Sequence, residues 1–258
     1  MSEDNSMQTI NRTIQVLKSF TSEVREQSLS SLHKDLGLSK SSLQRILNTL
    51  VLHGLLEKDN NRKTYKLGME LYYLGKLVEE HSHLISTVKP HLKSLRDRLG
   101  ENVYLNVIEN NQRKCIAFEE AKQLLMTISH VGQTSPLHAG ASAKLLLAYL
   151  SQTEIEEYII EKNLEVITEK TIADKSKLRD ELKEIRANGY ASSFGERVPG
   201  VFAASAPILS RDGQLIAGIA VSAPMVRVDD EVINTFIIAI KEVAAQISNE
   251  IRFQDALV

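Results

Sequence analysis

The tightest constraint on the fold comes from residues 28–68, where two helical patterns are separated by a very short turn. The first pattern repeats leucine on one face, and we expect Ser30 to cap that helix and Gly37 to end it. A single residue separates this glycine from Ser39, which offers the cap of a further helix running to His53. Two helices joined by a tight turn that contains glycine are typical of a helix-turn-helix.

The helix expected after Ser39 has one apolar and one polar face. The apolar stripe consists of Leu43, Ile46, Leu47 and Leu50. The opposite side collects short polar and cationic side chains, which are Lys40, Ser41, Gln44, Arg45 and Asn48. Such a face fits the major groove of a duplex, where Gln44 and Arg45 have donors that can read base edges. Lys40 would sooner contact phosphates, and an ordinary solvated helix face is the competing interpretation.

A polar hairpin follows this helix. Two short strand patterns, Leu55–Lys58 and Thr64–Leu67, flank a loop that carries Arg62 and Lys63 near its tip. The hairpin would turn the module into a winged helix-turn-helix, and the two loop cations would neutralise phosphates.

The charge of this module differs from that of the rest of the chain. Residues 28–68 hold seven basic and three acidic residues, whereas the whole chain holds 31 basic and 33 acidic residues and a net charge of −2. A small basic module joined to a larger acidic one predicts a polyanionic partner at one end and a different role at the other.

Helical patterns also precede and follow the basic module. Ile10, Ile14 and Leu17 predict a first helix with one apolar stripe, and Met69–His81 continue as an amphipathic helix. This second segment has no proline and no flexible glycine-serine tract, so it is expected to be a stiff connector. We therefore divide the chain into a winged helix-turn-helix domain over residues 1–68, a linker helix over 69–85 and a second domain over 86–258.

The second domain mixes helices and strands. Strands are expected over residues 103–108, 114–119, 124–129, 190–194, 201–209 and 215–222. Helices are expected over residues 86–99, 141–150, 154–162 and 176–187 and in a long amphipathic stretch that closes the chain. Groups of strands flanked by helices predict an antiparallel sheet of the α+β class.

The basic segment resembles the DNA-binding module of IclR-type bacterial transcriptional regulators. The shared features are a Leu-Gly-Leu turn, a Lys-Ser pair, an arginine on the recognition helix and Tyr-x-Leu-Gly after the wing. One departure is Ser42, where the family commonly has threonine; the hydroxyl is kept, and Ser42 joins the expected DNA-binding residues. The resemblance implies a homodimer or a dimer of dimers that binds a pseudo-palindromic operator in double-stranded DNA.

The second domain resembles the effector-binding domain of the same family. Its markers are GQTSPLHAGASAKLLLAYL from Gly132, Gly195-Glu196 followed by Pro199-Gly200-Val201, and Ser222-Ala223-Pro224. The resemblance implies a GAF-like fold that encloses a small organic effector. The expected function is a DNA-binding transcriptional regulator controlled by that effector, with repression the favoured mode and activation the alternative. We expect no cofactor.

The expected effector site combines a helix start with two strands. Its residues are Gly140, Ala141, Ser142, Ser193, Val201, Ala203, Ala220 and Ser222. Small residues before a helix leave backbone N–H groups unpaired, so the amides of Ala141 and Ser142 could hold a carboxylate. Residues two apart on a strand point to one face, so the strand members could form an apolar wall with one hydroxyl. Tight helix-on-sheet packing is the alternative use of such small residues.

Two departures from the family pattern bear on the effector. Members that bind small oxoacids have cysteine and serine where this chain has Ala203 and Ala220, while Ser222 keeps the matching hydroxyl. Because two polar contacts are lost, we expect a ligand larger or less polar than a two- or three-carbon acid.

Two other classes of function remain open in the sequence. An enzyme could use Cys115 and His138 as a nucleophile–base pair with Glu196 beside them, although Cys115 lies in an apolar strand pattern typical of an inert thiol. A ligand-binding or dimerisation module without DNA binding is the second alternative. We expect no metal site, because the chain has one cysteine and no histidine–carboxylate spacing typical of ligands. No segment predicts a membrane span or a signal peptide, so a cytoplasmic protein is expected.

Overall fold

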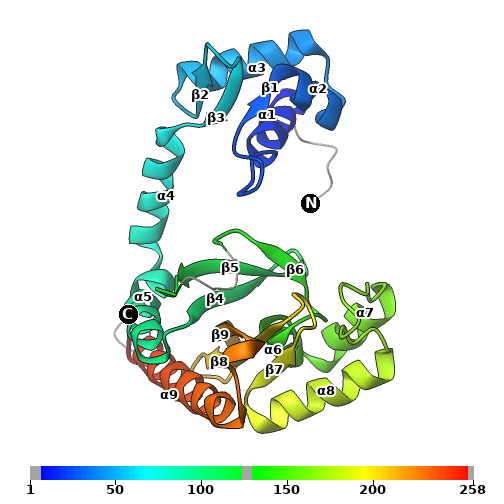
Figure 1. The fold of residues 1–258 in the computed structure, drawn as a ribbon, viewed down its shortest axis with the longest axis vertical. Coiled ribbons are helices and arrows are strands. Elements are labelled where there is room, and N and C mark those ends of the chain that lie inside the picture. The colour runs from blue at the N-terminus through cyan, green and yellow to red at the C-terminus, as the bar shows by residue number, and fades with distance from the viewer. Residues whose placement is uncertain (1–6, 124–129, 255–258) are drawn as a thin grey trace. The chain divides into compact units, whose positions relative to one another are not determined.

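The computed structural model describes residues 7–123 and 130–254. The chain divides into two compact units, Met1–Ser82 and His83–Val258, which we call unit 1 and unit 2. Unit 1 runs from α1 to α4, and unit 2 runs from α5 to α9 (Figure 1). The strand expected over residues 124–129 lies outside the described residues.

Unit 1 combines helices with a small antiparallel sheet. Its elements are α1 (Gln8–Lys18), β1 (Gln27–Ser28), α2 (Leu29–Leu36), α3 (Lys40–Leu52), β2 (Leu56–Asp59), β3 (Thr64–Leu67) and α4 (Met69–His81). The sheet has the order β1-β3-β2, so the expected hairpin forms and a short strand that the sequence did not indicate is added at its edge. This arrangement is a winged helix-turn-helix, as expected.

The recognition-helix prediction is confirmed in detail. The Ser39 hydroxyl accepts a hydrogen bond from the Ser42 N–H, and the helix ends at Leu52. The whole predicted apolar stripe is buried, and Leu43 and Leu47 are completely withdrawn from solvent. Together with Val16 of α1 and residues of α2, β2 and β3, the stripe forms the core of unit 1.

One detail of the preceding helices was predicted wrongly, and another was not foreseen. The cap of α2 is Ser28 rather than Ser30, because the chain is still extended at Ser28 and its hydroxyl accepts the Ser31 N–H. The helix expected from Ile10, Ile14 and Leu17 forms as α1, but the chain covers its apolar stripe only in part. Ile10 and Ile14 are exposed, Leu17 packs against the core, and Val16 is fully buried.

Unit 2 is built on one antiparallel sheet. Its elements are α5 (His83–Leu99), β4 (Asn102–Glu109), β5 (Gln112–Glu119), β6 (Thr134–Pro136), α6 (Ala141–Ala148), α7 (Gln152–Glu161), α8 (Lys175–Asn188), β7 (Ala191–Phe194), β8 (Val201–Leu209), β9 (Leu215–Pro224), a short 3-10 helix η2 (Met225–Arg227) and α9 (Asp230–Gln254). The strand order is β6-β5-β4-β9-β8-β7, and every pair is antiparallel.

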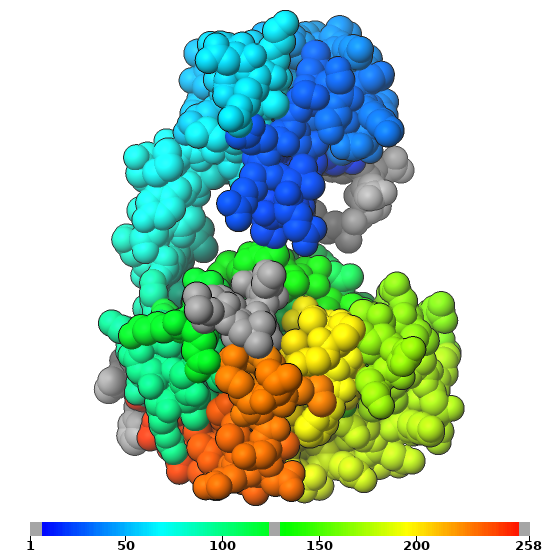
Figure 2. Space-filling view, viewed as in Figure 1, coloured from blue at the N-terminus to red at the C-terminus, as the bar shows by residue number. Residues whose placement is uncertain are grey.

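Helices cover both faces of this sheet (Figure 1). One face packs against α5 and α9, and the other packs against α6, which in turn contacts α7 and α8. In the space-filling view, α7 and α8 form one contiguous yellow-green lobe (Figure 2), joined by an ion pair between Glu156 and Arg179. The neighbouring residues Ala203 and Ala204 pack into different clusters, as the alternation of a strand requires.

The α+β class expected for the chain is confirmed, with a winged helix-turn-helix followed by an antiparallel sheet flanked by helices. The boundary between the first long helices differs from the expected one. The amphipathic helix expected over Met69–His81 is confirmed as α4. The next helix, α5, begins at His83 rather than at about Ser86, so residues 83–85 of the expected linker belong to α5. Strand β6 had no counterpart in the sequence analysis, because three residues that include a proline give no period-two pattern.

Candidate functional site

The first candidate site is the solvent-facing side of α3. Lys40, Ser41, Arg45 and Asn48 are exposed, whereas Ser42 and Gln44 are partly buried. The Gln44 amide nitrogen donates to Asn48 Oδ1 at 2.8 Å and to the Tyr65 hydroxyl at 3.3 Å, so the fold already uses the group expected to read bases. The Arg45 guanidinium has no hydrogen-bond or ion-pair partner in the described part of the chain. Arg45 is therefore the side chain on this face best placed to contact a partner.

The tip of the hairpin is held rigid by Asp59. Its carboxylate accepts the N–H groups of Asn61 at 2.8 Å and Arg62 at 3.0 Å, and these hydrogen bonds lower the Asp59 pKa. Arg62 also lies 3.7 Å from a carboxylate oxygen of Glu26, so part of its charge is compensated within the chain. Lys63 is exposed and has no ion-pair partner among the described residues.

The second candidate site is a cavity in unit 2, with an empty volume of about 630 Å³ including its open mouth. Its walls come from β4, β5, β7, β8, β9, the start of α6 and the segment after β7. Every residue expected at the effector site lines this cavity: Gly140, Ala141, Ser142, Ser193, Val201, Ala203, Ala220 and Ser222. Pairing of Ala203 with Ser222 across β8 and β9 brings the strand members together. Their role as effector contacts stays a prediction.

At the start of α6 the chain provides acceptors for two N–H groups, and the anion site expected at the amides of Ala141 and Ser142 stays a prediction. The Gly140 N–H donates to Glu196 Oε2 and the Ala141 N–H donates to Ser193 Oγ, both at 3.0 Å. The chain thus supplies its own acceptors where the helix dipole favours negative charge. Gly140 adopts a φ of 89° here, which glycine reaches without steric cost.

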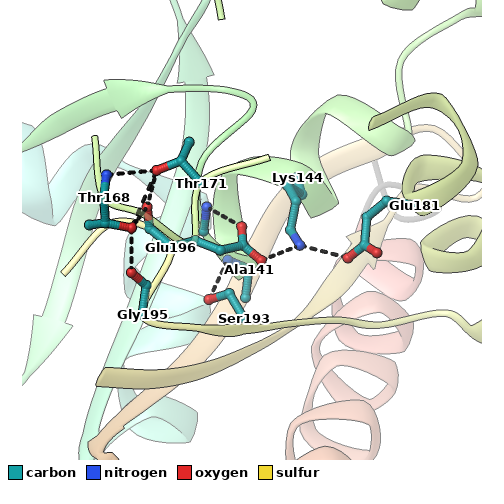
Figure 3. A network of polar contacts seen from close by, with 9 residues as sticks. Ala141, Lys144, Thr168, Thr171, Glu181, Ser193, Gly195 and Glu196 are labelled. Carbon is teal, nitrogen blue, oxygen red and sulfur yellow. Dashed lines mark hydrogen bonds and ion pairs between the residues drawn. The ribbon is translucent and has the colours of Figure 1, made fainter. Parts of the chain in front are cut away.

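A buried lysine ties the cavity to α8 (Figure 3). The Lys144 side chain is 1% exposed, and its Nζ donates to Glu181 Oε1 and Glu196 Oε1, both at 2.6 Å. The Glu196 loop is held further by Thr168 and Thr171, whose hydroxyls donate to the carbonyls of Gly195 and Glu196 at 2.7 Å. The sequence analysis gave Lys144 no role, although a lysine within the apolar run of α6 was a usable signal of a buried ion pair.

Two arginines of the cavity were also missed. Arg113 on β5 and Arg197 after β7 both line it. Arg113 lies two residues before the buried Cys115 on the same strand, so the period-two pattern could have placed both on one side. Arg197 had no comparable signal, because its position depends on how the segment after β7 folds back over α6.

The proposed nucleophile–base pair does not form. Cys115 is fully buried, and burial raises the pKa of its thiol to about 11. Both ring nitrogens of His138 are engaged, Nε2 with the Glu165 carbonyl and Nδ1 with the Tyr158 hydroxyl, each at 3.0 Å. Because a carbonyl only accepts, Nε2 carries the proton and Nδ1 accepts from Tyr158. Glu196 is held by Gly140 and Lys144 as described above.

Two kinds of feature are absent from the described residues. No group of three or more histidine, cysteine or carboxylate side chains is arranged to hold a metal ion. No helix in the same residues is long and apolar enough to cross a bilayer.

Comparison with known proteins finds the same relatives for both units. The family model described as "Bacterial transcriptional regulator IclR C-terminal" matches residues 77–249, and the one described as "IclR helix-turn-helix domain" matches residues 9–60. The HTH-type transcriptional regulator KipR of Bacillus subtilis is 31% identical over 225 residues, which are 87% of this chain and 90% of that protein.

Solved structures with this fold cover nearly the whole chain. An IclR transcriptional regulator from Alicyclobacillus acidocaldarius superposes with a TM-score of 0.87 at 23% identity, covering 95% of this chain and 99% of that one. An IclR homolog from Microbacterium hydrocarbonoxydans, in complex with 4-hydroxybenzoate, gives a TM-score of 0.82 at 24% identity and the same coverage.

Proposed function

The chain belongs to the IclR family of bacterial transcriptional regulators, and from this premise we propose how its two units divide the work. Unit 1 binds operator DNA through the exposed face of α3 and the hairpin tip, and unit 2 binds a small organic effector in the cavity. One observation supports DNA binding by unit 1. Arg45 lies beside Lys40 on the exposed face of α3, it has no partner among the described residues, and the other face of the helix packs into the core. The favoured mode is repression.

The DNA-binding residues are assigned separate roles. Arg45 reads base edges in the major groove, and Lys40, Arg62 and Lys63 contact phosphates. Ser41, Ser42 and Asn48 border the same face. The Gln44 amide nitrogen donates to a base only if the duplex replaces its hydrogen bonds to Asn48 and Tyr65.

Two copies of the chain are needed to read a pseudo-palindromic operator. Support for self-association comes from large apolar side chains that the single chain leaves in water. On α1 these include Ile10 at 53% exposed, and on α4 they include Tyr72 at 57% and Val78 at 67%. None of the residues of α4 is buried within the chain. Exposed apolar surface of this extent marks an interaction site.

The cavity accepts an effector and is assigned no reaction. The thiol of Cys115 is protonated at neutral pH because burial raises its pKa. Both ring nitrogens of His138 are engaged in hydrogen bonds, with Tyr158 and Glu165. Ala203 and Ala220 make one wall apolar, which favours a ligand larger or less polar than a three-carbon acid. The complex of the Microbacterium relative with 4-hydroxybenzoate supports a small organic acid. The effector controls DNA binding only if it binds one conformation of the protein more tightly than the other.

We expect Lys63→Ala to weaken binding to all DNA sequences alike, because a phosphate contact carries no sequence information. A gel shift on genomic fragments first selects bound DNA, and titrations with selected and scrambled duplexes then compare the variant with wild type. Each lost phosphate contact reduces the slope of log K against log salt by about 1. Arg211 is an exposed cation in the β8–β9 turn, and Arg211→Ala is the matched control. This variant should leave the affinity for both duplexes unchanged. A wild-type chain that shifts no fragment would instead favour a ligand-binding module without DNA binding.

A further inference from the structure

One wall of the unit 2 cavity carries hydrogen-bond donors that meet no carboxylate among the described residues. They belong to Asn106 on β4, Arg113 on β5 and Arg197 in the segment after β7. These residues lie outside the set that the sequence placed at the effector site. They are also separate from the start of α6, where Glu196 accepts the Gly140 N–H and Ser193 accepts the Ala141 N–H.

Arg113 is a buried cation with only neutral partners. The residue is 4% exposed, and its Nε donates to Ser135 Oγ and its Nη1 to Asn106 Oδ1, both at 2.7 Å. Its Nη2 has a longer contact of 3.4 Å with the Gln133 carbonyl. No carboxylate pairs with this guanidinium among the described residues, so its charge is oriented but not neutralised.

The Asn106 side chain presents a donor with no acceptor. Asn106 is completely buried, and its oxygen accepts from Arg113, which fixes the orientation of the amide because the reverse orientation would face two donors toward each other. The Asn106 Nδ2 group has no hydrogen-bond partner among the described residues. An unsatisfied buried donor is costly, so such a group in a cavity wall points to an absent acceptor.

Arg197 is a second cation in this wall, and it has no partner among the described residues. It is partly buried, and its guanidinium has no hydrogen bond or ion pair within the described chain. Burial lowers the pKa of both arginines, that of Arg113 to about 10, and the charge of Arg197 contributes to the lowering at Arg113. Both arginines line the same cavity, and neither is paired with a carboxylate in the described part of the chain.

The carboxylate in the cavity wall does not neutralise these two arginines. Glu196 also lines the cavity, but one of its oxygens accepts from Lys144 and the other from the Gly140 N–H. Burying a charge without a partner is expensive, and guanidinium groups match planar or tetrahedral oxyanions with paired N–H donors. The donors of this wall therefore lack an anionic acceptor, which a ligand could provide.

We propose that Arg113, Arg197 and the Asn106 amide form a subsite for the oxyanion of the effector, a carboxylate or a phosphate on a small organic compound. This inference rests on the proposed function of the cavity as an effector site. The subsite also explains why the cavity can keep an apolar wall at Ala203 and Ala220: the ligand's charge is held by β4, β5 and the segment after β7, and its apolar part faces β8 and β9.

The test compares wild type with Arg197→Met, because Arg197 makes no hydrogen bond that the fold would lose. The probes are benzoate, phenyl phosphate and the uncharged benzamide, measured by titration calorimetry and by the thermal midpoint of the full-length protein. We expect Arg197→Met to raise the Kd of the charged probe that binds wild type more tightly by about 30-fold or more. Benzamide binding should change little, and Arg197→Lys should recover part of the loss. The two charged probes distinguish a carboxylate ligand from a phosphate ligand.

A second readout separates binding from folding. The ligand-free thermal midpoint of Arg197→Met should equal or exceed that of wild type, because the variant removes a partly buried charge that has no partner among the described residues. The control Arg211→Met, an exposed arginine of the β8–β9 turn, should change neither the midpoint nor the affinities. The proposal is wrong if the charged probes stabilise wild type no more than Arg197→Met, if benzamide binds as well as benzoate, or if the ligand-free variant melts clearly lower. Operator binding is measured apart from these titrations, so a chain that binds DNA but fails here overturns only the subsite.

Discussion

Raising the salt concentration from about 50 to 200 mM is expected to weaken operator binding by about a thousandfold. The proposed phosphate contacts are Lys40, Arg62 and Lys63, and all three side chains are exposed. Two copies on one operator would neutralise about six phosphates, which gives a slope of log K against log salt near −5.4. Fluorescence anisotropy with a labelled operator at a series of KCl concentrations measures this slope.

The same titration tests the number of copies on the DNA. A single bound chain would neutralise about three phosphates and give a slope near −2.7. A slope close to zero would contradict the electrostatic account of unit 1 altogether. Because Arg62 is already near Glu26, its contribution should be the smallest of the three, and Arg62→Ala should change the slope less than Lys63→Ala.

Lys144→Met is expected to destabilise the folded chain by about 3–5 kcal/mol, because it leaves two carboxylates around a buried site without their cation. Lys144 Nζ is the shared partner of Glu181 and Glu196, and its side chain is 1% exposed. Urea unfolding followed by circular dichroism measures the loss. Since Glu196 also accepts a hydrogen bond from the Gly140 N–H, the variant should loosen the start of α6 and lower the affinity of the cavity for any ligand.

A matched lysine on α8 provides the control. Lys183 pairs with Asp180 at 3.2 Å, but both side chains are exposed, at 77% and 70%. Lys183→Met should therefore cost about 0.5 kcal/mol or less. Equal losses in the two variants would mean that the buried network contributes nothing specific to the cavity.

The sequence predicts the winged unit well where local patterns determine it. The stripe from Leu43 to Leu50 and the cap at Ser39 follow from helical spacing and serine chemistry, and the structure has both. The cap of α2 was misplaced because Ser28, Ser30 and Ser31 all lie near the helix start, and only the pairing of β1 with β3 selects Ser28. The exposure of Ile10 and Ile14 has no local signal either, since an apolar stripe does not say whether the same chain covers it.

The sequence predicts some residues of the cavity and not others. Its small residues could be grouped from strand alternation and the family resemblance, and they do line one cavity. The charged groups could not be grouped, because their partners are distant in sequence: Lys144 meets Glu181 and Glu196, and Arg113 meets Ser135. The acceptors at the α6 start, Glu196 for the Gly140 N–H and Ser193 for the Ala141 N–H, could not be predicted for the same reason. Which acceptor occupies an N–H group depends on how remote segments pack, and periodicity carries no information about that.

Base selection with wild type and Arg45→Ala tests the central claim, that the exposed face of α3 reads duplex DNA. Each protein selects sequences from a randomised duplex library, and the enriched motifs and affinities are compared, with Lys63→Ala as the variant that should keep the motif. We predict an inverted repeat for wild type, and loss of preference at one position of each half-site in Arg45→Ala, at a cost of roughly 1–3 kcal/mol. An Arg45→Ala protein that selects the same motif with the same affinity would contradict the account.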